Sequence, residues 1–410
     1  MTPRPVRANG TVIGRGAGIR VGIDASNIRM GGGLTHLVEV LRHVDAEAHG
    51  VASVVVWGGR RTLEEITARP WLRLEHVSAL DGALAVRTAW KSARLSALAA
   101  RACDVLFVPG GTYLGGFRPF VAVSQNLIPF EPAERARFGV VQHAKAILLE
   151  RTQAATFRRA DTTVFMSETN RRVVQARIGA LPGRTAVVPY GISTRFRASP
   201  RPQEPVSAYS ARRPFRWLYV STVDAYKHPW HLARAVALLR ARGIPVELDL
   251  VGPAFPRPLA RLRAELRRLD PAEAFLRYRG AVPYSELPGC YGRADGFAYP
   301  SSCETFGQTL VEAMSAGIPV ACARRSTMPE LLREHGAYFD PENPHDIART
   351  LHALMRDREL RERNVAAAAA RAAEFTWARC AHDTFAIIAD SAGANAPTRH
   401  SSSGPGDRTS

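Results

Sequence analysis

Short apolar runs alternate with stretches in which apolar residues recur every three or four positions along most of this chain. Such runs are typical of buried strands, and the three-to-four spacing is typical of helices. In the first half we expect strands at 19–24, 51–57, 104–108, 120–124, 162–166 and 186–189, and helices at 34–44, 83–101, 133–159 and after an N-cap at Ser167.

The second half repeats this rhythm. Strands are expected at 215–220, 246–252, 276–280 and 296–299, and helices at 230–242, 259–269, 284–293, 345–356, 359–374 and 377–389. Strands that alternate with helices predict parallel sheets covered by helices. The predicted fold class is therefore α/β, with two facing Rossmann-like, doubly wound parallel-sheet domains and a cleft between them.

A length of 410 residues suits two domains better than one. Between the halves, prolines, serines and arginines replace large apolar residues, which predicts a hinge. The expected organisation is a flexible leader at 1–18, a first, acceptor-side domain at 19–196, the hinge at 197–214, a second, donor-binding domain at 215–375, a C-terminal helix at 376–390 that braces the first domain, and a disordered tail at 391–410.

Composition narrows the class of protein. A hydrophobic fraction of 46% is normal for soluble globular proteins. The five cysteines are scattered, which favours reduced thiols and argues against a zinc site. The sequence shows no signal-peptide pattern and no apolar run of about 18 residues that could span a bilayer. We expect a cytoplasmic protein whose membrane contact, if any, is peripheral.

The net charge of +18 points to nucleic acid, an anionic membrane surface or acidic substrates. Only three of the 55 basic residues are lysines, namely Lys91, Lys145 and Lys227, so genome base composition also explains the excess of arginine. The aromatic residues are not interleaved with basic ones, so we expect no nucleic-acid partner. The basic helix expected at 133–159 suits anionic lipid or is a solvated face.

The stretch from Tyr299 to Val320 carries the most specific chemistry. A small-residue loop holding Glu304 follows a strand, and the next helix carries Glu312. Ligands of open α/β sheets collect at the carboxyl ends of strands, and a helix amino terminus attracts phosphate. Ionised carboxylates accept hydrogen bonds from sugar hydroxyls. We therefore expect a sugar nucleotide with one acid for each sugar ring; the alternative for Glu312 is a surface charge.

Three further groups follow predicted strands. The glycines Gly31, Gly32 and Gly33 form a phosphate cradle or a flexible turn. Gln125 and Asn126 either belong to the binding site or are polar residues that merely begin the loop after a strand. Lys227, preceded by Thr222, is a compact point charge that would neutralise a diphosphate leaving group, unless it is a surface lysine. The turn through Val282 would hold a planar base, on which Tyr284 either stacks or simply begins a helix.

These residues resemble the donor domain of the retaining glycosyltransferases of family 4, which have the GT-B fold. The resemblance covers residues 19–390 and is most specific from 215 to 335. It implies that Glu304 contacts the hydroxyls of the donor sugar, Glu312 those of the ribose, and Lys227 the diphosphate. It also implies a base-binding turn at 280–282 and backbone N–H donors to the sugar or its phosphate from Thr305, Phe306, Gly307 and Gln308.

Two departures from the family pattern matter. Thr222 stands where the family usually has an arginine beside the diphosphate, and Gln125-Asn126 stands where it often has His-Asp. A glutamine cannot titrate, so a general base at that position is excluded. In the family the departing phosphate is thought to deprotonate the acceptor. No Asp-x-Asp occurs, which fits neutralisation of the diphosphate by side chains and a helix terminus, without a metal.

The expected function is transfer of a mannose- or glucose-type hexose, with retention, from a UDP-, GDP- or ADP-sugar to a hydroxyl of a glycan or lipid-linked acceptor in polysaccharide or cell-wall assembly. No cofactor is expected, and an anionic membrane surface is an expected partner. The two acids differ from a hydrolase pair because they hold a donor and do not flank a scissile bond. The alternative is a nucleotide-sugar-binding protein without turnover.

Overall fold

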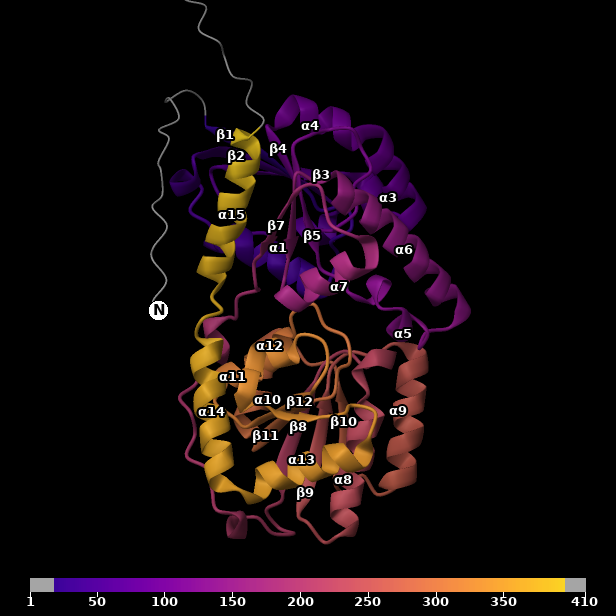
Figure 1. Cartoon of the computed structure of the whole chain (residues 1–410), viewed down its shortest axis with the longest axis vertical. Coiled ribbons are helices and arrows are strands. Elements are labelled where there is room, and N and C mark those ends of the chain that lie inside the picture. Colours follow the sequence, from indigo (N-terminus) through magenta and orange to yellow (C-terminus); the bar gives the residue numbers. More distant parts are fainter. Residues whose placement is uncertain (1–17, 395–410) are drawn as a thin grey trace, which may run out of the picture.

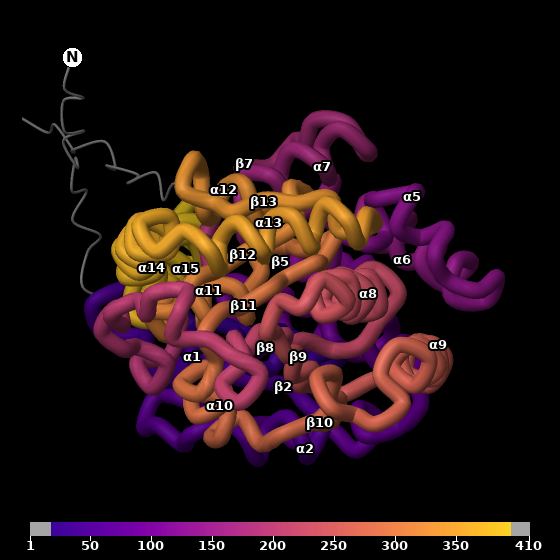
Figure 2. Tube along the Cα trace, turned by 90° about the horizontal axis from the view of Figure 1, so that it is seen from below, coloured from indigo at the N-terminus to yellow at the C-terminus, as the bar shows by residue number. Residues whose placement is uncertain are grey.

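The computed structural model describes residues 18–394, in which two parallel sheets lie one above the other, each with helices on both faces (Figure 1). The first sheet has seven strands in the order β3-β2-β1-β4-β5-β6-β7, and the second has six in the order β10-β9-β8-β11-β12-β13. The predicted α/β fold with two doubly wound domains is confirmed. In Figure 2, α8 and α9 lie on one side of the second sheet and α10 and α14 on the other.

The elements of the first domain follow the predicted alternation. They are β1 (Ile19–Asp24), α1 (Gly31–His43), β2 (Val51–Gly58), α2 (Arg60–Leu63), β3 (Leu72–His76), α3 (Leu84–Trp90), α4 (Ser96–Ala102), β4 (Val105–Val108), β5 (Phe120–Ser124), α5 (Pro132–Arg135), α6 (Val140–Arg159), β6 (Thr162–Phe165), α7 (Glu168–Ile178) and β7 (Arg184–Val187). A π-helical turn at Lys91–Leu95 joins α3 to α4. The predicted N-cap is present, because the Ser167 side chain accepts a hydrogen bond from the Asn170 N–H.

Two expectations for the first domain were wrong, and one strand was missed. The single helix expected at 133–159 is interrupted, because Gly139 has extended backbone angles and a new helix begins after it. The expected glycine loop is the first turn of α1, which begins at Gly31 with a φ of 67°. Strand β3 was missed because it is an edge strand whose residues are only half-buried or exposed, so no clear apolar pattern marks it.

The second domain matches its predicted elements closely. It consists of β8 (Phe215–Val220), α8 (Pro229–Ala241), β9 (Val246–Val251), α9 (Pro256–Leu269), β10 (Leu276–Gly280), α10 (Leu287–Arg293), β11 (Gly296–Tyr299), α11 (Gln308–Ser315), β12 (Val320–Ala323), α12 (Met328–Leu332), β13 (Ala337–Phe339), α13 (Pro344–Arg356) and α14 (Arg358–Ala372). The short edge strand β13 and the helix α12 were not predicted.

The last helix, α15 (Trp377–Gly393), crosses back and packs against α1, β4 and β5 of the first domain (Figure 1). It runs past the predicted end at residue 390, so residues 391–393 are helical and not tail. The predicted leader up to residue 17 and the tail from residue 395 lie outside the described residues.

The predicted hinge follows the second domain closely. Its Ala198 N–H donates to the Ser315 carbonyl at 3.0 Å, and its Arg201 N–H donates to the Gly317 carbonyl at 3.3 Å. Whether this segment bends stays a prediction. No helix within residues 18–394 has the length and apolar character needed to cross a membrane.

Candidate functional site

Lys227 and Glu304 form a buried ion pair at the carboxyl ends of two neighbouring strands. Lys227 lies in a short turn after β8, and Glu304 lies in the loop after β11, which pairs with β8. The Lys227 Nζ donates to Glu304 Oε1 and also to the Tyr299 hydroxyl at 3.3 Å. The two side chains are only 8% and 14% exposed. The surface-lysine alternative is therefore wrong.

The charge of this lysine is well supported. Burial is the largest single influence and lowers the pKa of Lys227, but the Glu304 carboxylate together with Tyr226 and Tyr219 raises it, and the net pKa is above the ordinary value. The Tyr299 hydroxyl donates to the same carboxylate oxygen at 2.5 Å. Lys227 therefore carries its positive charge, and Glu304 is held by two donors before any ligand arrives.

The loop around Glu304 is fixed by side chains of the second domain. The Ser326 hydroxyl accepts from the Glu304 N–H at 2.9 Å and donates to the Glu304 carbonyl at 2.8 Å. The Thr327 hydroxyl donates to the Phe306 carbonyl at 3.0 Å. Gly307, with a φ of 89°, then turns the chain into α11, whose first N–H groups lack helical partners. A cation, a carboxylate and a helix amino terminus thus occupy one place.

Glu312 is not a surface charge, because only 2% of the residue is exposed. Its carboxylate accepts hydrogen bonds from the Tyr291 hydroxyl at 3.0 Å and, more weakly, from the Tyr284 hydroxyl at 3.5 Å. Burial raises the pKa of Glu312 to about 8, and these two hydroxyls oppose only part of that increase. The carboxylate is therefore matched to hydroxyl donors, and no cation accompanies it in the described part of the chain.

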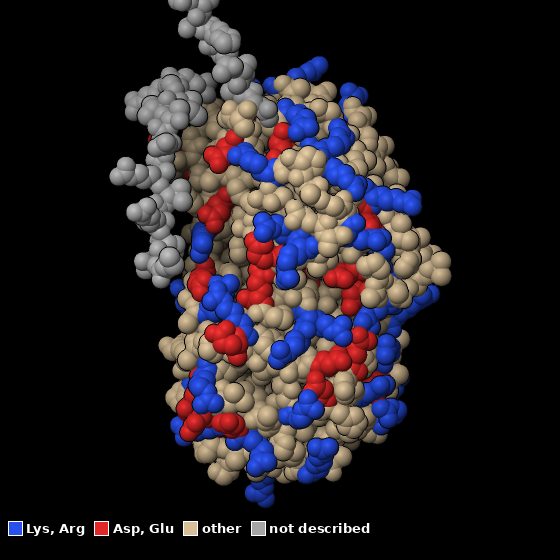
Figure 3. Space-filling view, viewed as in Figure 1, with Lys and Arg blue, Asp and Glu red and all other residues tan. Residues whose placement is uncertain are grey.

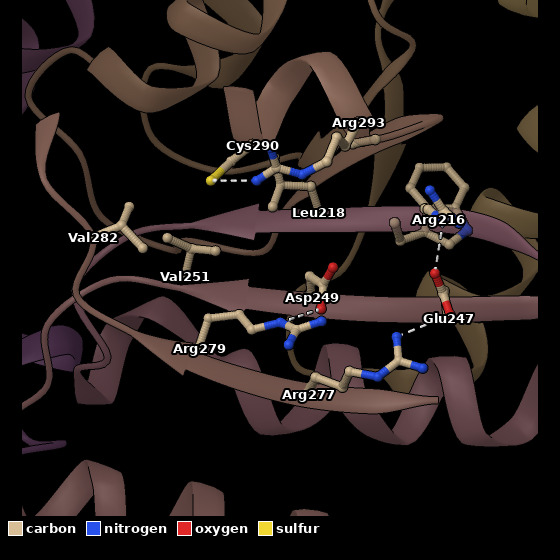
Figure 4. A pocket seen from close by; sticks show the side chains of 12 residues that line it. Arg216, Leu218, Glu247, Asp249, Val251, Arg277, Arg279, Val282, Cys290 and Arg293 are labelled. Carbon is tan, nitrogen blue, oxygen red and sulfur yellow. Dashed lines mark hydrogen bonds and ion pairs between the residues drawn. The ribbon is translucent and has the colours of Figure 1, made fainter. Parts of the chain in front are cut away.

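The other predicted donor residues of the second domain lie in separate surroundings. The Tyr284 ring packs against Phe196 with centroids 5.4 Å apart and lies 5.2 Å from the Arg195 guanidinium, while 38% of the residue stays exposed. The Thr222 carbonyl accepts from the Tyr219 hydroxyl at 3.3 Å. Val282 lines a cavity of about 500 Å³ on the face of β8, β9 and β10 (Figure 4).

The cavity in Figure 4 is not the candidate site. Three of its four arginines are paired with acids: Glu247 accepts from Arg216 and from Arg277, both at 2.9 Å, and Asp249 accepts from Arg279 at 2.9 Å, whereas Arg293 donates to the Cys290 Sγ at 3.7 Å. Neither Lys227 nor either of the two glutamates after β11 lines it. This face is a set of satisfied salt bridges across three strands.

Two of the three predicted glycines of the first domain lie beside predicted residues of both domains, whereas a Cβ added to Gly31 would meet nothing within 4 Å. A Cβ atom added to Gly33 would lie 2.8 Å from the Gln125 Oε1, and one added to Gly32 would lie 3.7 Å from the Gln308 Oε1. Since Gln308 begins α11, the amino termini of α1 and α11 face each other across the two domains. The structure therefore brings Gly32, Gly33, Gln125 and Gln308 together.

Sequence reasoning missed His36, the partner of Gln125. The Gln125 Nε2 lies 3.0 Å from the His36 Nδ1. Burial lowers the pKa of His36 to about 4, so the imidazole is neutral at neutral pH and its Nδ1 accepts from the amide. The sequence did hold a signal for His36, because it is a polar residue among the buried positions of α1. Asn126 acts differently, because its Oδ1 accepts from the Ile128 N–H at 3.1 Å within its own turn.

A second buried ion pair was also missed. The Lys91 Nζ lies 2.7 Å from the Oδ2 of Asp24, which ends β1, and 3.3 Å from the Thr112 hydroxyl after β4. Lys91 comes from the π-helical turn, a feature that is frequent at functional sites. The sequence could have drawn attention to Lys91, because the chain has only three lysines. The cluster lies at the carboxyl end of the first sheet, the edge that faces the second domain.

The first domain also contacts the loop of the predicted donor site directly. The Ser167 hydroxyl donates to the Thr305 carbonyl at 2.8 Å, and the Tyr190 and Phe306 rings pack edge to face at 5.7 Å. The carboxylate of Glu330 accepts from the backbone N–H groups of Glu168 at 3.0 Å and Thr169 at 2.9 Å, at the start of α7. These bonds tie the two domains together beside Glu304.

Residues 204–371 match the family model described as glycosyl transferases group 1. Over 174 residues the chain is 32% identical to the O-antigen chain mannosyltransferase B of Escherichia coli, an alignment that covers 41% of this chain and 44% of that protein. Over 257 residues it is 30% identical to the D-inositol 3-phosphate glycosyltransferase of Salinispora arenicola, covering 58% and 56%. The chain thus spans about half the length of these curated relatives.

Solved structures share the whole architecture. The sucrose-phosphate synthase of Thermosynechococcus elongatus superposes with a TM-score of 0.71 at 16% identity, over 92% of this chain and all of that chain. The Anabaena protein HepE, crystallised with UDP-glucose, superposes with a TM-score of 0.66 at 17% identity, over 91% of this chain and all of that chain. At this identity the likeness shows the fold, which is GT-B.

Proposed function

We propose that this chain, a member of the glycosyl transferases group 1 family by its residues 204–371, is a retaining glycosyltransferase that moves a hexose from a nucleotide diphosphate sugar to an acceptor hydroxyl. The observation that carries the proposal is the buried pair of Lys227 and Glu304 at the amino terminus of α11. A sugar diphosphate needs a cation and N–H donors at its phosphates and an acceptor at its hydroxyls, and this place offers all three.

The proposed roles follow from the surroundings of each group. Lys227 and the first N–H groups of α11 neutralise the charge that develops on the leaving diphosphate. Glu304 turns from Lys227 and Tyr299 towards the hydroxyls of the hexose. Glu312, which already accepts from two tyrosine hydroxyls, accepts from the ribose hydroxyls. No metal ion is required in this scheme, and activity that survives EDTA would support it.

Retention fits the groups on the acceptor side. Gln125 has no titratable proton, and the low pKa of its partner His36 makes that imidazole a weak base. We therefore assign the acceptor proton to the departing phosphate on the same face of the sugar. The acceptor enters from the first domain, past Gly31 to Gly33, and Gln125 orients it through its amide.

The hexose is of mannose or glucose type, in line with the printed name of the Escherichia coli relative and with the UDP-glucose of the HepE structure. The proposed acceptor is a glycan or lipid-linked glycan, used in polysaccharide or cell-wall assembly at the inner face of the membrane. Pelleting with anionic liposomes and with neutral ones tests the membrane part. Equal pelleting with both would contradict it.

The donor is tested by a thermal-shift panel of UDP-, GDP- and ADP-sugars. A ligand present at a hundred times its dissociation constant adds about 2.7 kcal/mol to the free energy of unfolding. Transfer or hydrolysis of the bound donor, abolished by Glu304→Gln, is the expected result. A donor that binds but is never turned over would instead favour a nucleotide-sugar-binding protein.

A further inference from the structure

A second cavity, of about 690 Å³, opens where the start of α6 meets α8 and α9, and both domains contribute to its walls. We call it the α6–α9 groove. Its walls are largely apolar, with Ile128, Phe138 and Leu149 from the first domain and Trp230 and Phe255 from the second. A concave apolar surface of this size is typical of ligand sites.

Exposed apolar side chains occur at the groove and elsewhere on α6. Phe255 is 55% exposed at the groove wall. Val140, Val141 and Leu148 of α6 are 87%, 61% and 63% exposed but do not line the groove. Large exposed apolar side chains in one region mark a binding surface more often than a solvated face.

Cations surround this apolar surface. Lys145, Arg257 and Arg261 line the groove, and none of them pairs with a carboxylate among residues 18–394. The Arg261 guanidinium lies 3.9 Å from the centre of the Trp230 ring. Partial burial and, to a smaller extent, the neighbouring Arg234 and Arg137 lower the pKa of Arg261, while Glu265 opposes this. In Figure 3, Lys and Arg side chains gather along the edge formed by α9.

Lys145 differs from the other two lysines of the chain in its surroundings. Of the three lysines, Lys91 and Lys227 are each held by a buried carboxylate, whereas Lys145 has no such partner among the described residues. Its ammonium is a compact, strongly hydrated charge on a flexible stem, suited to a phosphate at the rim of a groove. Arg137, which also lines the groove, is occupied by ion pairs with Glu134 and Glu342.

The groove borders the turn that carries Lys227. Asp224 and Ala225 line it, and they begin that turn. The ring of Tyr226, next in the turn, packs at 6.4 Å from Phe138 of the groove wall. Lys227 itself does not line the groove, so a molecule bound there would lie beside the candidate site.

We propose that the α6–α9 groove binds the apolar chain of an anionic amphiphile, an alkyl or polyprenyl phosphate, whose phosphate is held by Lys145, Arg257 and Arg261. As an acceptor site this rests on the proposed function, since the amphiphile is then the lipid part of the glycosyl acceptor. Charge complementarity decides between occupants, because a neutral chain or a second basic copy of this protein would leave three cations without a partner.

The test uses dodecyl phosphate with a brominated chain, below its micelle concentration, on the full-length protein. Bromine quenches tryptophan fluorescence on contact, and Trp230 lines the groove. We expect saturable quenching that Trp230→Phe removes. Phe255→Asp should weaken binding about tenfold or more because it places a charge against the chain. Leu114→Asp, at a similarly exposed apolar residue of the first domain, is the matched control and should leave binding unchanged.

Two ligands separate the head group from the chain. Dodecyl maltoside should bind about tenfold more weakly than dodecyl phosphate because its head group is neutral. Inorganic phosphate should compete only weakly, since it lacks the chain; strong competition would show a simple anion site and overturn the proposal. Equal affinity for the two amphiphiles, or equal binding by Phe255→Asp and Leu114→Asp, would also overturn it.

Two remaining outcomes are distinguishable. A dimer that Phe255→Asp converts to a monomer, with no binding of dodecyl phosphate, would assign the groove to contact between copies. Donor binding is measured separately by thermal shift with nucleotide sugars, and groove variants should leave it unchanged. If the unmodified protein does not bind any nucleotide sugar, the proposed function is contradicted. If it binds a nucleotide sugar but shows no quenching by the brominated amphiphile, only the proposed ligand of the groove is contradicted.

Discussion

The ammonium of Lys227 is paired with the carboxylate of Glu304, 77 residues further along the chain, at the carboxyl ends of the adjacent strands β8 and β11. Both side chains are largely buried, and the pair sits where α11 begins. The two groups assigned to a diphosphate and to a sugar therefore hold each other until a donor separates them. Without a donor, the pairing keeps both charges at the carboxyl ends of β8 and β11, where the proposed donor would bind.

Replacing Lys227 by alanine should lower kcat by about 100-fold or more, because the leaving diphosphate loses a preorganised cation. Lys227→Arg should not restore the rate, since a planar guanidinium does not fit the space of a buried ammonium. Steady-state transfer assays measure both. Arg349→Ala, which removes an exposed cation paired with Asp346, is the control and should leave kcat unchanged. A rate for Lys227→Ala within a few-fold of the unmodified protein would contradict the assigned role.

Burial raises the pKa of Glu312 to about 8, and this gives the protein a pH-dependent stability. Because the folded-state pKa is raised above that of the unfolded chain, the folded state holds a proton that the unfolded state has lost. The free energy of unfolding should therefore fall as the pH rises from about 4.5, the ordinary pKa of the carboxyl, to about 8. Glu312→Gln should flatten this part of the profile in urea denaturation between pH 5 and pH 9.

The control for that profile is Glu359→Gln, at a side chain that is 83% exposed, which should follow the unmodified protein. Donor affinity should change with pH in the opposite direction to stability, because only the ionised carboxylate of Glu312 accepts hydrogen bonds from both ribose hydroxyls. Donor affinity should rise through the same pH range. Parallel stability profiles for Glu312→Gln and Glu359→Gln would show that Glu312 does not titrate there.

Gly33→Ala should disturb the acceptor side selectively. The new methyl group would lie 2.8 Å from the Gln125 Oε1, so the amide must move and its bond to His36 is weakened. We expect a higher KM for the acceptor, with the thermal shift by the donor preserved. Gly292→Ala, where an added Cβ meets nothing within 4 Å, is the control. A lowered donor shift with an unchanged acceptor KM would place the glycine on the donor side instead.

Lys91→Met should destabilise the first domain by about 3 kcal/mol, because it leaves the buried Asp24 carboxylate without its counter-charge. The double variant Asp24→Asn/Lys91→Met should recover most of that loss, since it removes both charges. Urea denaturation of Lys91→Met, Asp24→Asn and the double variant gives the free energies of unfolding that complete the double-mutant cycle. Additive losses would mean that the two side chains do not interact.

Much of the second domain could be predicted because its central strands are mostly buried and read as apolar runs. Strands at 215–220 and 296–299 coincide with β8 and β11, and the strand at 276–280 coincides with β10, although β10 is an edge strand that carries two arginines. The edge strands β3 and β13 escaped prediction because their half-exposed residues do not repeat an apolar pattern. The interruption before α6 escaped it because one glycine ended a helix that the surrounding residues favour.

The sequence by itself determined that Glu304 follows a strand and that Glu312 lies on the next helix, because local spacing sets both positions. It also singled out Lys227 by the rarity of lysine. Only the tertiary structure decided that Lys227 meets Glu304, that Glu312 is buried against Tyr291, and that Gln125 is paired with His36. Those pairings depend on which strands are neighbours and on how deeply each side chain is buried. Contacts between residues far apart in the chain fix both, and no local pattern records them.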